Sequence, residues 1–386
     1  MEKKYVVINI GSASKKYGLY GEAELCGVHM EKTSDGYLGT VTIGNEKQEV
    51  AITADDYDNA GAYLMRLAGE KNLAQISDIT KIGIRIVAPG KFFQEDKVID
   101  DNYIAALTAD REMAPLHIGP ILEEIEKIRN WANGIPLWGI SDSAFYKDMP
   151  VEAKLYGLSK ELASEYGIYR YGYHGISMSS VIDIIQKMQG SVPDKMIICH
   201  LGSGSSITAV KNGKPLDTSM GFTPLEGVPM GTRVGNIDAA AVLYLLKKGG
   251  FDASTLETML YRKSGLFGLS GKTPFVKELI DLEKTGDASA GEALAVFARS
   301  VRKFIGAYAA LLGGLDCLVF TATIGQRSDY IRAKICADFE YLGMVLDSAK
   351  NTAMISTNGF IQSDNSQTKI AVVVTEEMTE MVKRCA

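Results

Sequence analysis

The sequence has few of the residues that build metal clusters or disulfide frameworks. Among 386 residues there are only four histidines and five cysteines. The cysteines are scattered, odd in number and include no Cys-x-x-Cys pair, which excludes a disulfide framework and a zinc site. The histidines and carboxylates show no metal-ligand spacing, so a metallohydrolase is not predicted. We therefore expect reduced thiols and a cytoplasmic protein.

Long apolar runs and basic runs are also missing. No segment approaches the roughly 18 apolar residues that a membrane-spanning helix needs. The apolar run near the N-terminus is too short for a signal peptide and contains Asn9. A net charge of −6 without a basic run argues against nucleic acid. We expect neither a membrane nor a nucleic-acid partner.

The segments that are present alternate between strands and helices, with no long proline-rich linker. Strand patterns cover residues 4–54 as a meander, then 81–89, 135–141, 195–219, 316–325 and 369–375. Helical patterns cover residues 55–72, 117–132 and much of 237–310. The predicted class is α/β. Because the chain is too long for one ordinary core, we expect two domains, 1–148 and 149–386, with the last helix packed back on the first.

A strand–turn–strand unit occurs once in each half. In "VVINIGSASKKYGLY" and "IICHLGSGSSITAV" an apolar strand enters a Gly/Ser turn, and Gly11 aligns with Gly202. Glycine backbone and serine hydroxyls suit a tetrahedral anion. Two such turns would hold a polyphosphate from both sides, although two ordinary Gly/Ser hairpins would give the same pattern.

Two other phosphate motifs are excluded. The turn at Gly202 lacks the third glycine of a dinucleotide fingerprint and runs into a strand, where that motif needs a helix. The segment "GLFGLSGKTP" resembles a Walker A loop, but Leu266 occupies the first glycine position. We interpret Thr273 as a helix cap with Pro274 at the first helical position.

Charged and imidazole side chains cluster at strand ends and turns. Arg85 interrupts an apolar strand, Arg233 lies in a glycine-flanked turn, and Asp142 ends a strand. Three of the four histidines adjoin Gly or Pro turns: His117, His174 and His200. A structural role is ordinary for any single one of them. Together these groups suit an anionic substrate and a charged transition state.

At this point the sequence resembles the acetate/propionate kinase family of the sugar kinase–Hsp70–actin superfamily. The matching segments run in order along nearly the whole chain. They include "VVINIGSASKKY", "SDSAFYKDMP", "YRYGYHGIS" and "CHLGSGSSITAVKNGKPLDTSMGFTPLEGVPMGTRVGNID". The resemblance implies two duplicated actin-like, ribonuclease H-like domains around a central cleft, and a homodimer. It also implies Mg²⁺-dependent phosphoryl transfer between ATP and a short carboxylate such as acetate or propionate, giving acyl phosphate and ADP.

The resemblance also implies roles for individual residues. Arg85 and Arg233 would hold the carboxylate and the transferred phosphoryl group, and Asp142 would be the essential acid. His174 would stabilise the transition state, supported by His117. Asn9 and Glu377, or Glu376 with a one-residue gap, would lie at Mg²⁺. The implied nucleotide-binding residues are Asn9, Ser12, Ser14, Lys16, His200, Gly202, Ser203, Gly204, Phe275, Lys277, Thr323 and Gly325. The implied acyl pocket consists of Val87, Leu116, Tyr173 and Pro224.

The sequence departs from the family pattern mainly where the adenosine would bind. Ser203 replaces an asparagine, Thr323 a glycine, and Thr273–Lys277 a Ser-Ser-Asp-Met-Arg segment, while Tyr173 replaces a phenylalanine. Three functions stay open on this basis. The first is an ATP-dependent acetate or propionate kinase. The second is a carboxylate kinase with another donor, such as pyrophosphate or another nucleotide, or with a more polar acid. The third is a metabolite-binding homologue with little turnover.

Overall fold

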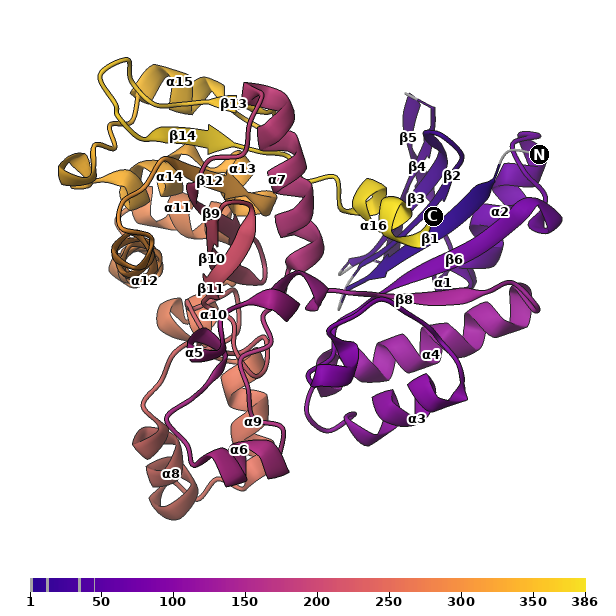
Figure 1. The fold of residues 1–386 in the computed structure, drawn as a ribbon, viewed down its shortest axis with the longest axis horizontal. Helices are drawn as coiled ribbons and strands as arrows, with labels where there is room; N and C mark the ends of the chain where they lie inside the picture. Colours follow the sequence, from indigo (N-terminus) through magenta and orange to yellow (C-terminus); the bar gives the residue numbers. More distant parts are fainter. Residues whose placement is uncertain (1–2, 12–13, 34–35, 45) are drawn as a thin grey trace. The chain divides into compact units, whose positions relative to one another are not determined.

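The computed structural model describes all residues except 1–2, 12–13, 34–35 and 45, and it leaves the side chains of residues 115 and 116 undescribed. The chain forms two compact units, which Figure 1 shows by sequence colour. The first contains Met1–Lys147 together with Glu376–Ala386, and the second contains Asp148–Thr375. Each unit is described separately below.

The first unit is built on an eight-stranded sheet in the order β5-β4-β3-β2-β1-β6-β8-β7. Its strands are β1 (Lys4–Ile10), β2 (Ser14–Tyr20), β3 (Glu24–Thr33), β4 (Gly36–Ile43), β5 (Glu46–Ala51), β6 (Ile79–Ile86), β7 (Lys97–Val98) and β8 (Leu137–Ser141). Strands β1 to β5 form an antiparallel meander, whereas β6 runs parallel to β1 and β8 parallel to β6. Parallel pairing brings the carboxyl ends of β1, β6 and β8 to one edge of the sheet.

The helices of the first unit are α1 (Ala54–Asp58), α2 (Ala60–Glu70), α3 (Asp101–Ala109), α4 (Pro115–Trp131) and α16 (Glu377–Cys385), with short 3-10 turns at Ile76–Asp78, Lys91–Phe93 and Ala144–Asp148. Helix α16 packs on β1 and β6. The single helix predicted over residues 55–72 is wrong in one respect, because Asn59 divides it into α1 and α2. The Asn59 side chain donates to Asp55, an alternative to helical pairing that asparagine favours.

The second unit has a six-stranded sheet in the order β11-β10-β9-β12-β14-β13. Its strands are β9 (Lys195–Leu201), β10 (Ser205–Lys211), β11 (Lys214–Thr218), β12 (Cys317–Thr321), β13 (Gly359–Phe360) and β14 (Lys369–Val372). The hairpins β9–β10–β11 are antiparallel, β12 is parallel to both β9 and β14, and β13 is antiparallel to β14. This pairing repeats that of β3-β2-β1-β6-β8-β7, so the α/β class with a duplicated sheet is confirmed.

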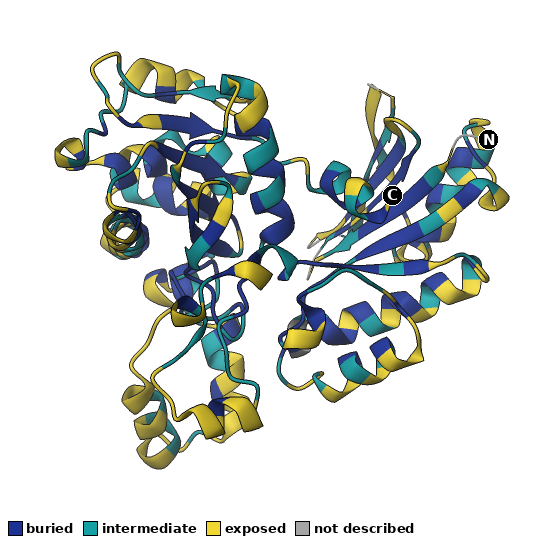
Figure 2. Ribbon diagram, in the orientation of Figure 1, coloured by how far each residue is buried: buried dark blue, intermediate teal, exposed yellow. Residues whose placement is uncertain are grey.

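The helices of the second unit are α5 (Val151–Lys154), α6 (Lys160–Glu165), α7 (Gly175–Gln189), α8 (Ala239–Lys248), α9 (Ala253–Arg262), α10 (Gly265–Ser270), α11 (Val276–Lys284), α12 (Ala288–Leu312), α13 (Ala322–Arg327), α14 (Asp329–Cys336) and α15 (Ser348–Ala353), with a 3-10 turn at Glu340–Leu342. Figure 2 shows β9, β12 and the inner side of α12 as buried. No helix in the described part of the chain is both long and apolar enough to cross a bilayer.

Two sequence predictions in this unit are wrong in detail. The strand predicted over 316–325 ends at Thr321, and residues 322–327 form α13. Helix α11 begins at Val276 rather than at Pro274. The reason is local, because the Thr273 hydroxyl accepts from the Phe275 amide at 3.2 Å and donates to Glu278. These bonds hold residues 273–275 in a turn before the helix.

Candidate active site

Four polar side chains meet at the carboxyl edge of the first sheet. Asn9 lies on β1, Arg85 on β6, Asp142 directly after β8, and Glu377 at the start of α16. Arg85 Nη2 donates to Asp142 Oδ2 at 2.9 Å, and Arg85 Nη1 donates to Asn9 Oδ1 at 3.2 Å. Asn9 Nδ2 donates to Glu377 Oε2 at 3.1 Å, which lies 3.9 Å from Arg85 Nη1. The structure therefore brings four predicted site residues into one network.

The charge on Arg85 is stabilised by this network. Burial alone would lower its pKa, but the charges of Asp142 and Glu377 and the hydrogen bond to Asp142 raise the pKa above its usual range. Asp142 is almost fully buried, with 1% exposed, and its carboxylate forms an ion pair with the guanidinium away from water. A charged planar guanidinium whose two Nη atoms are held by Asn9 and Asp142 is suited to binding anions.

Asn9 and Glu377 offer an amide and a carboxylate oxygen, the ligand types that Mg²⁺ takes in proteins. Glu376 occupies the N-cap of α16. Among the described residues there is no cluster of three or more His, Cys, Asp or Glu side chains that would enclose a metal.

The first Gly/Ser turn joins β1 and β2. The Gly11 amide donates to the Ser14 carbonyl at 2.8 Å, and Asn9 lies opposite Lys16 in the β1–β2 register. The Lys16 side chain is exposed. Ser12, also predicted at this turn, lies outside the described residues. The turn keeps Asn9 and Lys16 on the same face of the ribbon.

The second unit holds two predicted histidines against each other. His174 and His200 stack with ring centroids 4.0 Å apart and an interplanar angle of 19°. His174 Nδ1 bonds to the Ser206 hydroxyl at 2.9 Å, and His200 Nδ1 to the Ser177 hydroxyl at 2.8 Å. Ser206 is the register partner of His200 on neighbouring strands. The His174 ring therefore lies over a preformed Ser–His pair.

His174 adopts a backbone conformation that a side chain rarely takes. Its φ is 63° and its ψ 24°, and it forms the N-cap of α7. Non-glycine residues in this region are strained and are concentrated at functional sites. In this backbone conformation the imidazole ring lies against His200 on β9 and Ser206 on β10.

Gly204 joins His174 to the second predicted arginine. A methyl group on Gly204 would lie 3.3 Å from His174 Nε2 and 3.5 Å from Arg233 Nη1. Arg233 Nη1 donates to the Pro224 carbonyl at 3.1 Å. Because Gly204 has no side chain, an imidazole and a guanidinium lie against the same turn, where both can address one anion.

The second Gly/Ser turn is closed by its own backbone. The Gly202 amide donates to the Gly204 carbonyl at 3.0 Å, and the Ser203 carbonyl accepts from Gly231 at 3.4 Å. Gly325, in α13, packs with a would-be Cβ 3.3 Å from the Phe320 carbonyl carbon. Ala322 begins α13 with a φ of 62°, and the neighbouring Thr323 is exposed. The turn and α13 thus border the same part of the second sheet.

The segment predicted to meet the adenosine lies at the surface. Phe275 is 62% exposed, and Lys277 is exposed on the first turn of α11. Pro274 packs near Gly231, at 3.4 Å from the position of a Cβ there. An exposed aromatic ring beside the loop that carries Arg233 is available for stacking.

The four predicted acyl-pocket residues divide between the units. Val87 is buried in the first unit, which also contains Leu116 in the first turn of α4; the side chain of Leu116 is outside the description. Tyr173 is buried in the second unit, where its hydroxyl donates to the Phe222 carbonyl at 2.7 Å. This hydroxyl is therefore bonded within the protein. His117 lies in the first turn of α4 and is half-buried.

Sequence reasoning missed several residues that support the site. Ser177 and Ser206 orient the two imidazoles. Ser177 lies three residues after His174, and Ser206 lies two residues after Gly204, so both are inside the predicted motifs. Lys15, not Lys16, is the buried lysine of the first turn, and its Nζ lies 2.9 Å from Glu124 Oε2 on α4. The Tyr17 hydroxyl donates to the other oxygen of Glu124. No local signal marked Glu124, because its partners lie on a distant strand.

Three comparisons with known proteins agree. The sequence profile of the acetokinase family matches residues 4–383. Acetate kinase of Bacillus cytotoxicus is 36% identical over 381 residues, covering 97% of this chain and 96% of that protein. The crystal structure of Porphyromonas gingivalis acetate kinase has a TM-score of 0.86 at 31% identity, covering 99% of this chain and 98% of that one. A propionate kinase from Francisella tularensis gives a TM-score of 0.89 at 30% identity, with 99% of both chains covered.

These matches extend over nearly the whole chain and agree with the order of the motifs and with the two sheets of matching topology. The resemblance predicted from the sequence is confirmed: the chain belongs to the acetokinase family.

Proposed function

We propose that this protein is a short-chain carboxylate kinase, which transfers a phosphoryl group reversibly between ATP and acetate or propionate. The observation that carries the proposal is the Arg85 network, in which Asn9, Asp142 and Glu377 fix a buried guanidinium at the carboxyl edge of a parallel sheet. Family membership and relatives named acetate kinase and propionate kinase support this function over the alternatives left open by the sequence.

In the forward reaction a carboxylate oxygen attacks the γ-phosphorus, and the bond from that phosphorus to the ADP oxygen breaks. The electron pair leaves with ADP, and the products are acyl phosphate and ADP. The carboxylate is already a nucleophile, so no strong base is needed. The chemical difficulty is to bring an anion up to a polyanion. We assign that work to Arg85, Arg233 and His174, whose donors neutralise the equatorial oxygens in the transition state.

Asp142 acts in this proposal by holding the Arg85 guanidinium, which donates to its Oδ2 at 2.9 Å. His117, on α4, is the second supporting imidazole. The nucleotide phosphates are assigned to the turns at Ser12, Ser14 and Lys16 and at Gly202, Ser203 and Gly204, with His200 beneath the second turn. Phe275, Lys277, Thr323 and Gly325 are assigned to the nucleoside end.

Mg²⁺ is the proposed metal cofactor, held by Asn9 and Glu377. When bound it neutralises phosphate charge. Asn9 would offer its side-chain oxygen to the cation and Glu377 a carboxylate oxygen. Glu377→Gln is expected to raise the Mg²⁺ concentration for half-maximal activity about tenfold or more. Glu376→Gln is the matched comparison, and we expect the larger effect at Glu377, because Glu377 is the carboxylate that accepts from Asn9.

Val87, Leu116, Tyr173 and Pro224 are assigned to the acyl group, and small to medium apolar side chains predict a short pocket that takes acetate and propionate. Since the Tyr173 hydroxyl donates to the Phe222 carbonyl, a polar acid gains no donor from it. Tyr173→Phe should leave the ratio of kcat/KM for glycolate and propionate unchanged. A changed ratio would mean that this hydroxyl addresses the substrate.

A homodimer and a cytoplasmic location complete the proposal. Helix α8 has no buried side chain, and Leu243 and Tyr244 are 51% and 66% exposed on it. A second copy of the chain would remove this apolar surface from water. Light scattering should give twice the chain mass, and Tyr244→Glu should lower it. The five cysteines are all free and buried, which suits a reducing compartment.

The reaction is tested by trapping acyl phosphate as a hydroxamate. Purified protein is incubated with Mg²⁺, ATP and each of acetate, propionate and butyrate, and then with hydroxylamine. We expect product with acetate and propionate, dependent on Mg²⁺. Absence of hydroxamate with every acid and with ATP, GTP and pyrophosphate would contradict the carboxylate kinase and favour a binding protein.

A further inference from the structure

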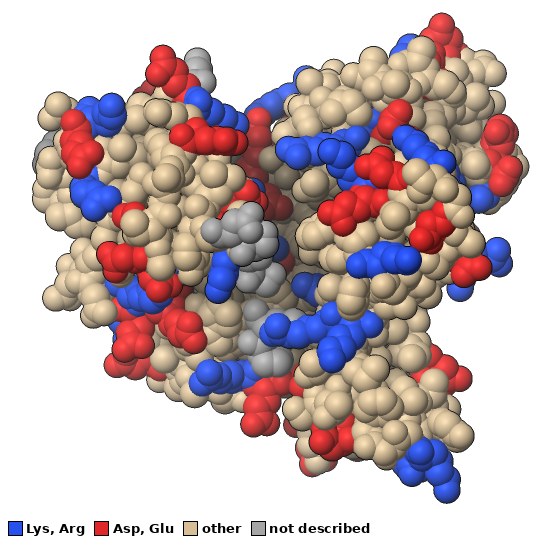
Figure 3. All heavy atoms as spheres, turned by 180° about the vertical axis from the view of Figure 1, so that it is seen from behind, with Lys and Arg blue, Asp and Glu red and all other residues tan. Residues whose placement is uncertain are grey.

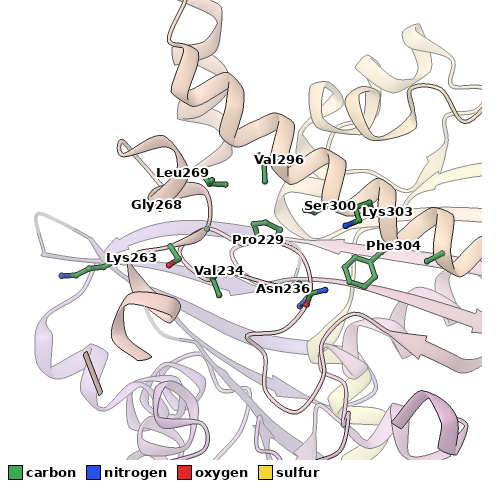
Figure 4. A pocket seen from close by; sticks show the side chains of 14 residues that line it. Pro229, Val234, Asn236, Lys263, Gly268, Leu269, Val296, Ser300, Lys303 and Phe304 are labelled. Carbon is green, nitrogen blue, oxygen red and sulfur yellow. The ribbon is translucent and has the colours of Figure 1, made fainter. Parts of the chain in front are cut away.

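A cavity lies in the second unit, beside the loop that carries Arg233. Its volume is about 650 Å³, within the range of small-molecule sites. Figure 4 shows its walls: the loop residues Pro229, Val234 and Asn236, the α10 residues Gly268 and Leu269, and the α12 residues Val296, Ser300, Lys303 and Phe304. None of these residues is among those assigned above to substrate, nucleotide or metal.

The loop over residues 227–236 contributes residues to both the cavity and the candidate site. Asn236 closes the loop at its base. The Asn236 side-chain Oδ1 accepts from the Gly227 backbone N–H at 2.8 Å, and the Asn236 backbone N–H donates to the Gly227 carbonyl at 2.8 Å. Pro229 and Val234 line the cavity, whereas Arg233, between them, contacts the Pro224 carbonyl. One short closed loop thus has a cavity face and an arginine face.

Helix α10 ties the cavity wall to that loop. The Leu266 amide donates to the Met230 carbonyl at 2.8 Å, and the Ser264 amide donates to the Thr232 carbonyl at 3.0 Å. Gly265 has a φ of 61°, and a Cβ there would lie 2.1 Å from the Met230 carbonyl oxygen. Contact this close means that a displacement of α10 is transmitted to the backbone that carries Arg233.

The chemistry of the cavity walls indicates its ligand. The body is apolar, with Val234, Leu269, Val296 and Phe304. Lys303 lies beside Ser300 on the α12 wall, and within the described chain Lys303 has no ion pair or hydrogen bond. Lys263 also lines the cavity, but its side chain extends away from the other labelled side chains in Figure 4. An apolar chamber with a cation, a serine hydroxyl and an amide at its wall suits an organic anion.

We infer that this cavity binds a small organic anion, with an apolar body against Phe304 and Leu269 and a carboxylate or phosphate at Lys303, and that binding alters turnover through the Arg233 loop. A bound ligand changes activity only by its differential affinity for two arrangements of that loop. Couplings of this kind are typically about 5- to 150-fold.

Calorimetry tests binding without turnover, so its result does not depend on the proposed function. The probes are 3-phenylpropionate, phenyl phosphate and the neutral 3-phenylpropan-1-ol. We expect at least one anion to bind the wild-type protein, and the alcohol to bind at least tenfold more weakly. Lys303→Gln should weaken the anion at least tenfold. Arg299→Gln is the matched control, because it removes an exposed charge from the same helix outside the cavity. Equal affinities of the two variants would overturn the assignment.

A second variant separates a ligand site from an interface between copies. Ser300→Phe fills the cavity, and it should abolish anion binding while leaving the mass in solution unchanged. A changed mass with anion binding retained would overturn the inference and mark this face as a subunit contact. With hydroxamate as readout, the bound anion should change kcat/KM at least fivefold in wild-type protein and in Arg299→Gln, but not in Lys303→Gln. Binding with no change in kcat/KM would refute the coupling through the Arg233 loop.

Discussion

His174 lies face to face on His200, with their ring centroids 4.0 Å apart. His174 is the ring beside Gly204 and Arg233, where the transferred phosphoryl group is proposed to bind. We propose that His200 is a positioning residue that supports the His174 ring by stacking, and its own bond to Ser177 sets its orientation.

The first prediction concerns the two serines. Ser206→Ala removes the hydroxyl bonded to His174 Nδ1 and should lower kcat about tenfold, because the imidazole loses its fixed orientation. Ser177→Ala, which frees His200 instead, should lower kcat less. Steady-state kinetics with acetate and ATP compares them, and thermal unfolding controls for stability. A larger loss in Ser177→Ala would reverse the roles given to the two histidines.

The second prediction concerns Arg233. Arg233→Ala removes a preorganised cation beside Gly204 and should lower kcat/KM by about 100-fold or more. Arg233→Lys should recover little, because a point charge cannot replace the planar fork. Arg262→Ala, an exposed arginine on α9, is the control and should keep wild-type kcat/KM. Near-wild-type kinetics in Arg233→Ala would remove Arg233 from the site.

The sequence was sufficient for the parts of the site that depend on strand ends and turns. Arg85 inside an apolar strand and Asp142 at a strand end were predicted as functional, and they form one ion pair. The reason is that parallel strands bring their carboxyl ends together wherever the loops lead. The repeat of Gly11 at Gly202 was likewise reproduced as two matching hairpins.

The parts that failed depend on partners distant in sequence. Lys15 and Lys16 are neighbours on β2 and point to opposite faces of the sheet, and Lys15 is buried where it meets Glu124 on α4 and the Tyr57 ring. The position at which β12 ends, Thr321, also depends on tertiary contacts, which stabilise the following helix α13. There the buried Arg332 donates to the Gly325 and Gln326 carbonyls and so stabilises α13. No local propensity encodes such contacts.

The third prediction concerns stability at this junction. Ala322 has a φ of 62°, which costs an L-residue about 1–2 kcal/mol, whereas glycine adopts it freely. Glycine also raises the entropy of the unfolded chain, so Ala322→Gly should stabilise by a net ~0.5 kcal/mol. Ala333→Gly, at an exposed position within α14, should instead destabilise by about 1 kcal/mol. Urea unfolding measures both. A loss of stability in Ala322→Gly would show that the packing of the Ala322 methyl group outweighs the backbone strain.

The fourth prediction concerns pH. Glu283 on α11 accepts from the Tyr330 hydroxyl at 2.6 Å and from Lys334 Nζ at 2.9 Å on α14. Burial raises the pKa of Glu283, but these two bonds and the lysine charge outweigh it and lower the pKa. A carboxylate with a lowered folded pKa stabilises above its unfolded pKa, and this stabilisation is lost as pH falls through the folded pKa.

Glu283→Gln should therefore lower the melting temperature by about 2–4 °C at pH 7 and by less as the pH approaches 3. Glu292→Gln, an exposed carboxylate on α12 without a described partner, should show no such pH dependence. Differential scanning calorimetry at several pH values measures the difference. An equal difference at pH 7 and pH 3 would mean that the charge on Glu283 is not what stabilises the α11–α14 contact.

The fifth prediction concerns the phosphoryl donor. Phe275 and Lys277 occupy positions where the family pattern has an acid and an arginine, and Phe275 is 62% exposed. A site that pairs with an exocyclic group rejects bases lacking it, whereas stacking on an aromatic ring accepts any base. We therefore expect ATP and GTP to have kcat/KM values within about tenfold of each other, measured at saturating acetate. Phe275→Ala should lower both in parallel, and Phe267→Ala, on α10, is the comparison variant. If Phe275 acts by stacking on the base, kcat/KM with pyrophosphate, which has no base, should be unaffected by Phe275→Ala. A preference for ATP over GTP of a hundredfold or more would mean that other residues contact the adenine edge.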